Sequence, residues 1–277
     1  MEALNGIKNI KIYDNTMFHL EDCMKEYQRY ISLLEEFDMK ELAFFLRTLR
    51  RNELINNQEN ENELTLLMEL ESEMENTNSI EMMTNIINSK EKITLDHVQK
   101  IHQRLLKGTI DDHARNYPYR TFPVRVSGME NGKEIISYVP PEPEEIIPYM
   151  EYILNYLNDD KNMQMESVFL KPVIAHAYIA ILQPFGNGNT RIARLLQYGK
   201  LFDLTNKYFG KDFPHPILYL SKNYLLTRGS YRSKFEQIAK FSNDESWNKW
   251  FEYNLNMIDE QLYYVINNLE QYRMRRK

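Results

Sequence analysis

The chain has 277 residues and a net charge of −6 at pH 7, with 43% hydrophobic and 27% charged residues. This length suits one large domain or a domain with a smaller attachment, and the acidic balance carries no signature of nucleic-acid binding. The lone Cys23 excludes an internal disulfide and a zinc cluster, and no apolar run looks long enough to span a bilayer. We therefore expect a cytoplasmic protein without nucleic-acid or membrane partners, although a protein exported without a cleaved signal would look the same.

Helical periodicity dominates the first third of the chain. Residues 18–55 carry apolar side chains near a 3.6-residue period, which predicts helix over this range. The polar, unperiodic run 56–63 predicts a surface loop, and 64–88 is a second helix-like block. Only 9 glycines and 10 prolines interrupt the chain, so we expect long helices rather than many short strands.

The middle of the chain contains the one predicted hairpin. Thr94 is placed to cap a helix over 95–106, and Gly108 is placed to end it. Over 122–138 the apolar period changes to two, with a turn sequence in the middle, which predicts two antiparallel strands. A helix is expected to follow over 144–157.

The last part of the chain is again predicted to be helical, with Trp247 and Trp250 in the core. Helices are expected over 167–182, 190–203, 221–241 and, as a final pair, within 245–274. The fold class is thus mainly α with one hairpin. The chain divides into an N-terminal helical region, 1–92, a core, 93–205, and a C-terminal helical extension, 206–277.

The stretch 183–194 reads QPFGNGNTRIAR and has the composition of a phosphate-binding turn. Gly186 and Gly188 permit backbone angles and close approach that other residues do not. Asn187 and Asn189 tolerate left-handed turns and offer amide donors. Main-chain N–H groups at the start of the next helix would then point at an anion.

Two arginines reinforce this interpretation. Arg191 and Arg194 are three residues apart, so they share a face of the following helix. Positive side chains are costly at the helix end that already carries partial positive charge, and a bound anion would offset this cost. A triphosphate matches the forked donors of two guanidinium groups.

The same stretch resembles the core motif of the Fic family, His-Pro-Phe-x-(Asp/Glu)-Gly-Asn-Gly-Arg-x-x-Arg. The likeness extends along most of the chain: Tyr119-Arg120 and the hairpin look like the family's approach strand and target-docking flap, and Trp247-x-x-Trp250 is similar to the C-terminal extension of larger bacterial members. The resemblance implies a helical Fic core. It also implies transfer of AMP from ATP, with Mg²⁺ on the phosphates, to a Tyr, Thr or Ser hydroxyl of a target protein.

The resemblance assigns roles to individual positions. Gln183 stands where the family has its general base, and Asn187 stands where a carboxylate holds Mg²⁺, so Asn187 is a weak magnesium ligand. Asn189 corresponds to the anion-hole residue and Arg194 to the anchor of the γ-phosphate. The full set of expected nucleotide-binding residues is Gly186, Asn187, Gly188, Asn189, Thr190, Arg191 and Arg194.

A second family feature is an inhibitory helix with the pattern (Ser/Thr)-x-x-x-Glu-(Gly/Asn). Thr77–Met82 is similar to it and puts Glu81 at the inhibitory position, with Met82 departing from the pattern. Such a glutamate would pair with Arg194 and occupy the place of a γ-phosphate oxygen. A weaker match occurs at 32–37, and the alternative for Glu81 is an ordinary exposed helix charge.

Gln183 leaves several functions open. Its amide cannot take a proton at neutral pH, and losing a general base typically costs about 10²–10⁴ in rate. We consider His113 and His176 as replacements and favour a packed, hydrogen-bonded role for His176. The leading hypothesis is an adenylyltransferase of low activity that modifies a protein, itself included. The alternatives are a nucleotide-binding pseudoenzyme or partner-binding module, and transfer of another phosphate-containing group. A homo-oligomer also stays open.

Overall fold

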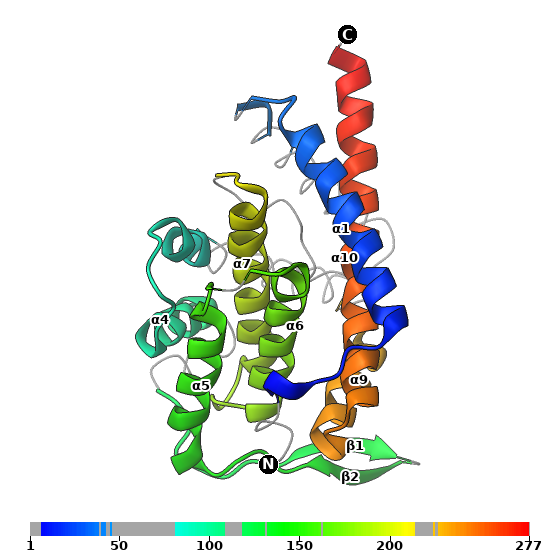
Figure 1. Cartoon of the computed structure of the whole chain (residues 1–277). Coiled ribbons are helices and arrows are strands. Elements are labelled where there is room, and N and C mark those ends of the chain that lie inside the picture. Colours follow the sequence, from blue (N-terminus) through cyan, green and yellow to red (C-terminus); the bar gives the residue numbers. More distant parts are fainter. Residues whose placement is uncertain are drawn as a thin grey trace.

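The computed structural model describes residues 7–38, 40–42, 45, 81–108, 118–130, 132–161, 163–213, 224 and 227–276. These residues form a helical protein with one two-stranded antiparallel sheet, which confirms the predicted fold class (Figure 1). The elements in chain order are the 3₁₀ turn η2 (Ile7–Asn9), α1 (Asp14–Leu34), α4 (Leu95–Leu106), β1 (Val126–Glu130), β2 (Lys133–Tyr138), η4 (Pro143–Glu145), α5 (Ile146–Asn158), α6 (Met165–Leu182), α7 (Asn189–Phe209), α9 (Arg228–Phe241) and α10 (Asp244–Arg276). Residues 81–88 are also helical.

Helix α6 is the central element. All its residues from Val168 to Leu182 are buried, and it packs against α1, α5, α7, α9 and α10. A helix that is apolar all round is typical of a core position. Contrary to our expectation for the sequence, α6 alone among the described helices would suit a membrane span by its length and mean hydropathy of 1.4, but 83% of it is buried inside the protein.

Two groups of helices flank the central pair, α6 and α7. Figure 1 shows α4 and α5 on one side and α1, α9 and α10 on the other. Trp250 on α10 is fully buried, and its Nε1 donates to the main-chain oxygen of Val173 on α6, 2.9 Å away. Trp247 is 3% exposed, so both tryptophans are core residues, as predicted.

Local signals in the sequence are confirmed around α4. The Thr94 hydroxyl accepts a hydrogen bond from the His97 N–H at 3.2 Å, and His97 Nδ1 accepts one from the Thr94 N–H. Gly108 follows the helix with a φ of +80°, a left-handed conformation that suits the position after a helix end. The hairpin is also confirmed, although β1 begins only at Val126, paired with Tyr138.

The predicted continuous helix over 18–55 is wrong, because α1 ends at Leu34 and a turn follows. Asp38 Oδ1 accepts from the Glu41 N–H, and Glu41 Oε2 accepts from the Asp38 N–H, each at 2.9 Å. This reciprocal pair is a capping box. It starts a new helix inside a stretch whose apolar period gives no sign of a break.

The predicted pair of helices within 245–274 is also wrong, because α10 is one helix of 33 residues. No Gly or Pro interrupts this segment, so no residue in it favours a break. Helix α7 likewise continues past the predicted end at 203 to Phe209, where Gly210 takes a φ of +63°. Ser221, the first residue of the helix predicted over 221–241, lies outside the described residues.

Candidate functional site

The turn between α6 and α7 lies where the sequence predicted it, at residues 183–188. Helix α6 ends at Leu182 and is capped by Gln183, whose φ and ψ of +51° and +58° are left-handed and uncommon for a residue with a side chain. Pro184 follows and has no N–H to continue the helix. Gly188, with a φ of +80°, then forms the N-cap of α7.

Phe185 anchors this turn in the core. Its ring is 1% exposed and stacks on the rings of His102 and Tyr119, with centroids 3.9 and 5.0 Å away. His102 Nε2 also donates to the main-chain oxygen of Asn187 at 2.9 Å. Burial lowers the pKa of His102, so a neutral ring holds the turn by its face and by one donor. Sequence reasoning missed His102, which lies 85 residues before Asn187.

Asn189 braces the turn from inside. Its Nδ2 donates to the main-chain oxygen of Phe185 and to Gln183 Oε1, both at 2.9 Å, and its Oδ1 accepts from the Phe185 N–H at 2.7 Å. The side chain is 6% exposed. Both N–H groups of this amide are therefore used within the turn, and the anion-hole contact implied by the resemblance stays a prediction.

Gln183 is held by the chain itself. Its Oε1 accepts from Asn189 Nδ2, and its Nε2 donates to the main-chain oxygen of Ala180 at 2.6 Å. Neither atom is a base at neutral pH. Each of these two atoms keeps one further hydrogen-bonding position, so Gln183 can orient a hydroxyl through the second lone pair of Oε1 but cannot deprotonate it.

The start of α7 has the features of an anion site. The first N–H groups of a helix point out of it without intrahelical partners. Asn187 Oδ1 accepts from the Gly188 N–H at 2.6 Å and from Arg191 Nη2 at 3.4 Å, which places the Arg191 guanidinium over the turn. A helix N-terminus with a guanidinium beside it favours a phosphate group.

Asn187 does not fit the role of a resident magnesium ligand. Its side-chain oxygen already accepts hydrogen bonds from Gly188 and Arg191, and Mg²⁺ prefers charged oxygens. Among the described residues, no three His, Cys, Asp or Glu side chains are grouped so as to hold a metal ion. Magnesium would therefore have to arrive with the nucleotide, on its phosphate oxygens.

Arg120 ties the turn to the hairpin. Its guanidinium is buried and donates to the main-chain oxygens of Gln183 at 2.7 Å, Phe122 at 2.9 Å and Pro141 at 2.5 Å. Its N–H donates to the main-chain oxygen of Pro184 at 2.9 Å. Burial lowers the pKa of Arg120, but a guanidinium stays charged at neutral pH. Its positive charge lies directly behind the turn.

The hairpin is fixed to the helices at both strands. The Tyr138 hydroxyl, at the end of β2, donates to a main-chain oxygen of α6 at 3.2 Å. Arg232 on α9 donates to the main-chain oxygen of Ser127 on β1. Ile135 and Ile136 remain 42% and 53% exposed, so the hairpin presents apolar side chains to solvent.

Arg194 is not paired with Glu81, because no ion pair joins them in the described part of the chain. Glu81 is exposed at the start of helical residues 81–88, which pack on α7 at Gly199. Arg194 is half-buried, and its charge partly offsets the burial that raises the pKa of the Tyr231 hydroxyl on α9. The inhibitory role of Glu81 therefore stays a prediction.

His176 does not replace the missing base. It is fully buried, with Nε2 2.7 Å from the Tyr231 hydroxyl and Nδ1 bonded to Gln197. Burial lowers the pKa of His176 to about 3, so the ring is neutral. This confirms the packed, hydrogen-bonded role predicted for it. His113 lies outside the described residues.

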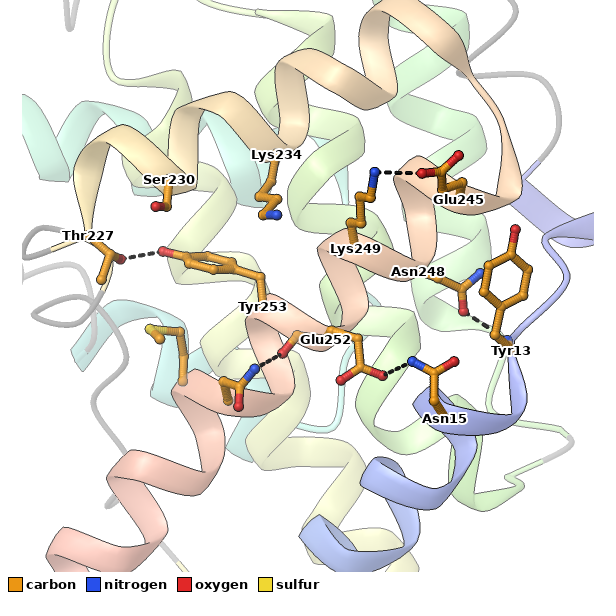
Figure 2. Close-up of a pocket in the computed structure, with 12 residues that line it drawn as sticks. Tyr13, Asn15, Thr227, Ser230, Lys234, Glu245, Asn248, Lys249, Glu252 and Tyr253 are labelled. Atoms are coloured by element: carbon orange, nitrogen blue, oxygen red, sulfur yellow. Dashed lines mark hydrogen bonds and ion pairs between the residues drawn. The ribbon is translucent and has the colours of Figure 1, made fainter.

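A separate cavity of about 550 Å³ is lined by residues near the start of α1 and by residues of the α9 and α10 regions. Figure 2 shows Thr227 and Tyr253 on its wall with their hydroxyl oxygens 2.5 Å apart, and Lys249 paired with Glu245 at 2.6 Å. None of residues 183–194 lines it. It is therefore distinct from the phosphate turn.

A family model described as the Fic/DOC family matches residues 92–198, which include α4, the hairpin, α5, α6 and the start of α7. Residues 92–198 are therefore a Fic domain. Over 105 residues, the chain is 31% identical to the protein adenylyltransferase fic-1 of Caenorhabditis briggsae, and over 106 residues it is 27% identical to that of Caenorhabditis elegans. Each match covers 38% of this chain and 18% of the relative, so the chain matches less than a fifth of the length of these curated relatives.

Solved Fic structures share the fold beyond the matched domain. A Fic-domain-containing signaling protein from Bacteroides thetaiotaomicron superposes with a TM-score of 0.61 at 16% identity, covering 90% of this chain and 97% of that one. A structure of Fic-1 from C. elegans gives a TM-score of 0.61 at 16% identity, covering 93% of this chain and 73% of that one. The shared architecture thus includes helices on both sides of the Fic domain.

Proposed function

We propose that the Fic domain binds ATP on the α6–α7 turn and slowly transfers AMP to a hydroxyl group of a protein. The observation that carries this proposal is the turn itself, in which left-handed Gly188 starts α7 and Arg191 lies over the loop. Arg194 follows one helical turn later. The similarity of the domain to protein adenylyltransferases supports AMP as the transferred group.

The charges around the turn suit the leaving group of this reaction. The acceptor oxygen bonds to the α-phosphorus, the bond from that phosphorus to the bridging oxygen breaks, and pyrophosphate leaves. Donors that are already in place stabilise the charge developing on pyrophosphate. The N–H groups at the start of α7, Arg191 and Arg194 would supply these donors, with Arg120 behind them.

Slow transfer follows from Gln183. With no side-chain base, the proton of the acceptor hydroxyl passes to solvent, and the rate falls by about 10²–10⁴ relative to a site with a base. A tyrosine acceptor, with a pKa of about 10, would suffer least. A target segment would dock against the hairpin, where Ile135 and Ile136 are exposed.

A second candidate function is nucleotide binding without transfer. The observation that favours it is the bonding of Gln183, whose two amide atoms are both satisfied by the chain. A side chain engaged in this way braces the turn and supplies no base to an acceptor hydroxyl. The α6–α7 turn would then bind a nucleotide as a sensor or bind a partner protein.

Labelling separates the two functions. We expect the protein, incubated with MgATP labelled on the α-phosphate, to incorporate label slowly into itself or an added protein. Arg194→Ala should abolish this incorporation, because it removes the anchor of the γ-phosphate. Gln183→His should raise it by about 10²-fold or more, because it restores a base.

The outcomes are distinct. Binding of ATP by calorimetry without label in the wild type or in Gln183→His would support the second candidate. Absence of ATP binding altogether would contradict both functions. If Glu81 is inhibitory, Glu81→Gly should also raise the label, and unchanged labelling would count against that role.

A further inference from the structure

The cavity lined by the start of α1, α9 and α10 contains none of the residues used in the proposed reaction. Its volume of about 550 Å³ is in the range of about 300–1,000 Å³ that small-molecule sites occupy. One wall is fixed by Asn248, which is 3% exposed. Its side chain accepts from the Tyr13 N–H and donates to the main-chain oxygen of Lys11, both at 2.8 Å. The chain that enters α1 is therefore tied to α10, and the cavity is already formed in the folded protein.

Two carboxylates line the cavity, and each is already engaged by another group of the protein. Glu245 pairs with Lys249 at 2.6 Å. Glu252 accepts from Asn15 Nδ2 at 3.2 Å and lies 2.7 Å from His19 Nδ1. The negative charges of the wall are therefore offset where they stand.

Lys234 brings a positive charge to the same cavity without a partner. Figure 2 shows its side chain projecting from α9 toward α10, and the residue is half-buried. Within the part of the chain that the structure describes, its ammonium group forms no ion pair and no hydrogen bond. Among the described residues of the wall, Lys234 thus carries the charge that no other side chain offsets.

The start of α9 adds donors on the same side of the cavity. Thr227, Ser230 and Lys234 are three and four residues apart, so they share one face of the helix, and all three line the cavity. Thr227 is the N-cap, but its hydroxyl lies 2.5 Å from the Tyr253 hydroxyl and does not cap the helix. The first N–H groups of a helix without such a cap are open to an anion. A bound anion would meet these N–H groups, the Ser230 hydroxyl and the Lys234 ammonium group together.

We propose that this cavity binds a small organic acid with one carboxylate group and an apolar body. The single negative charge matches the unpaired ammonium group of Lys234, whereas the two lining glutamates disfavour a doubly charged phosphate ester. Tyr13, Tyr253 and Met257 supply apolar wall for the rest of the molecule. The inference goes beyond the proposed function and does not depend on it, so it can be tested without nucleotide.

Two matched substitutions test the proposal, with para-fluorobenzoate as the probe and para-fluorobenzamide as its uncharged counterpart. Lys234→Gln removes the unpaired charge. Lys240→Gln is the control, because Lys240 is on the same helix, does not line the cavity and has its ammonium group over the Phe241 ring. Fluorine NMR titration measures the dissociation constants, and thermal melting shows whether each variant is folded.

We expect the wild type to bind para-fluorobenzoate at least about tenfold more tightly than para-fluorobenzamide, and Lys234→Gln to remove most of this difference, which is the scale of one hydrogen bond to a charged group. Lys240→Gln should change both affinities by less than about twofold, because solvent and salt screen an exposed charge outside the site. Equal wild-type affinities for the two probes, or the same change in both variants, would overturn the proposal. Tighter binding of phenyl phosphate than of para-fluorobenzoate would overturn the assignment to a singly charged acid.

Ser230→Glu gives an independent measurement. It places a carboxylate in the first turn of α9 and four residues before Lys234, where the helix N-terminus and the lysine both favour it. The variant should melt no lower than the wild type and lose binding of para-fluorobenzoate, because its own carboxylate occupies the place of the acid. A stable variant that binds this probe as the wild type does would refute the site.

Discussion

An amide occupies position 187, where the proposed reaction would profit from a carboxylate. Asn187 Oδ1 bonds to the N–H of Gly188 and to Arg191. An aspartate has the same shape and two acceptor oxygens, so it can keep both bonds and still offer an oxygen to Mg²⁺. The main chain of the turn would not have to change.

We therefore predict that Asn187→Asp makes ATP binding depend on Mg²⁺. The ATP affinity of this variant in Mg²⁺ should exceed its affinity in EDTA by at least about tenfold, because unit charges about 4 Å apart near a protein surface interact by about 4 kcal/mol. Titration with ATP in Mg²⁺ and in EDTA measures the effect. The ATP affinity of the wild type should differ much less between the two conditions. Equal ATP affinities of the aspartate variant in Mg²⁺ and in EDTA would refute the prediction.

The residues of the turn could be predicted from the sequence, but their partners could not. The glycines, amides and arginines of 183–194 are contiguous, so their spacing alone indicates a phosphate turn. His102 reaches the turn from another helix. Nothing in its local sequence marks it, since a tertiary contact leaves no periodic signal. The inward bonding of Gln183 was equally invisible.

At the scale of elements, the helical residues 81–88 lie against α7 at its only glycine, Gly199. A Cβ at this position would lie 2.5 Å from Met83 Cγ and 2.7 Å from Ile87 Cδ1. Contacts this short force a neighbour to move. Gly199 thus allows residues 81–88 to approach α7 closely.

We predict that Gly199→Ala displaces residues 81–88 and costs about 1–3 kcal/mol, as overpacking of a core typically does. If this segment inhibits the site, the same substitution should raise incorporation of label from ATP. Thermal melting and the labelling assay measure the two effects. Lower stability with unchanged labelling would argue against inhibition by this helix.

Gly229→Ala is the matched control. This glycine lies in α9, and nothing stands within 4 Å of an added Cβ. Alanine in a helix is favoured over glycine by up to about 1 kcal/mol. The control should therefore be neutral or stabilising and leave labelling unchanged.

Elements with local signals were predicted well, and elements defined by packing were not. Thr94 and Gly108 mark the ends of α4 because caps act within a few residues. The end of α1 was missed because apolar periodicity continues across the Asp38–Glu41 capping box. The division of α10 into two helices was wrong because this part of the chain holds no residue that breaks a helix.

At the scale of the whole molecule, His19 joins the two ends of the described chain. It lies on α1 between two carboxylates of α10, with Nδ1 2.7 Å from Glu252 and Nε2 2.7 Å from Asp259. Burial alone would lower the pKa of His19, but its hydrogen bonds to Glu252 and Asp259 and their charges raise it above 6.5 overall. The protonated ring therefore favours the packing of α1 on α10.

The sign of the pH dependence follows. Because the pKa of His19 is higher in the folded than in the unfolded chain, its contribution is complete below about pH 6.5 and is lost as the pH rises through the folded value. Between pH 6 and pH 8.5 the wild type should lose about 2–4 °C in Tm relative to His19→Gln, the shift expected for about 1 kcal/mol. Parallel Tm curves for the two proteins would contradict this role.

The helical class and the existence of a Fic core could be predicted from the sequence, because periodicity and one contiguous motif carry both. The association of α1 with α10 could not. Amphipathic helices show which face is buried, but they do not show which helix covers it. His19 contacts Glu252, which lies 233 residues later in the chain, and no pattern within either helix predicts this contact.

The way in which the main chain is held at position 183 has a genetic consequence. Arg120 donates a hydrogen bond to the main-chain oxygen there, and every amino acid has this oxygen. Codons for glutamine and histidine differ only in their third base, so a single transversion would place an imidazole on a backbone already shaped to carry it. On the proposed function, the slow protein and a faster variant are therefore one base change apart. Random mutagenesis followed by screening for nucleotide label should recover the faster one repeatedly.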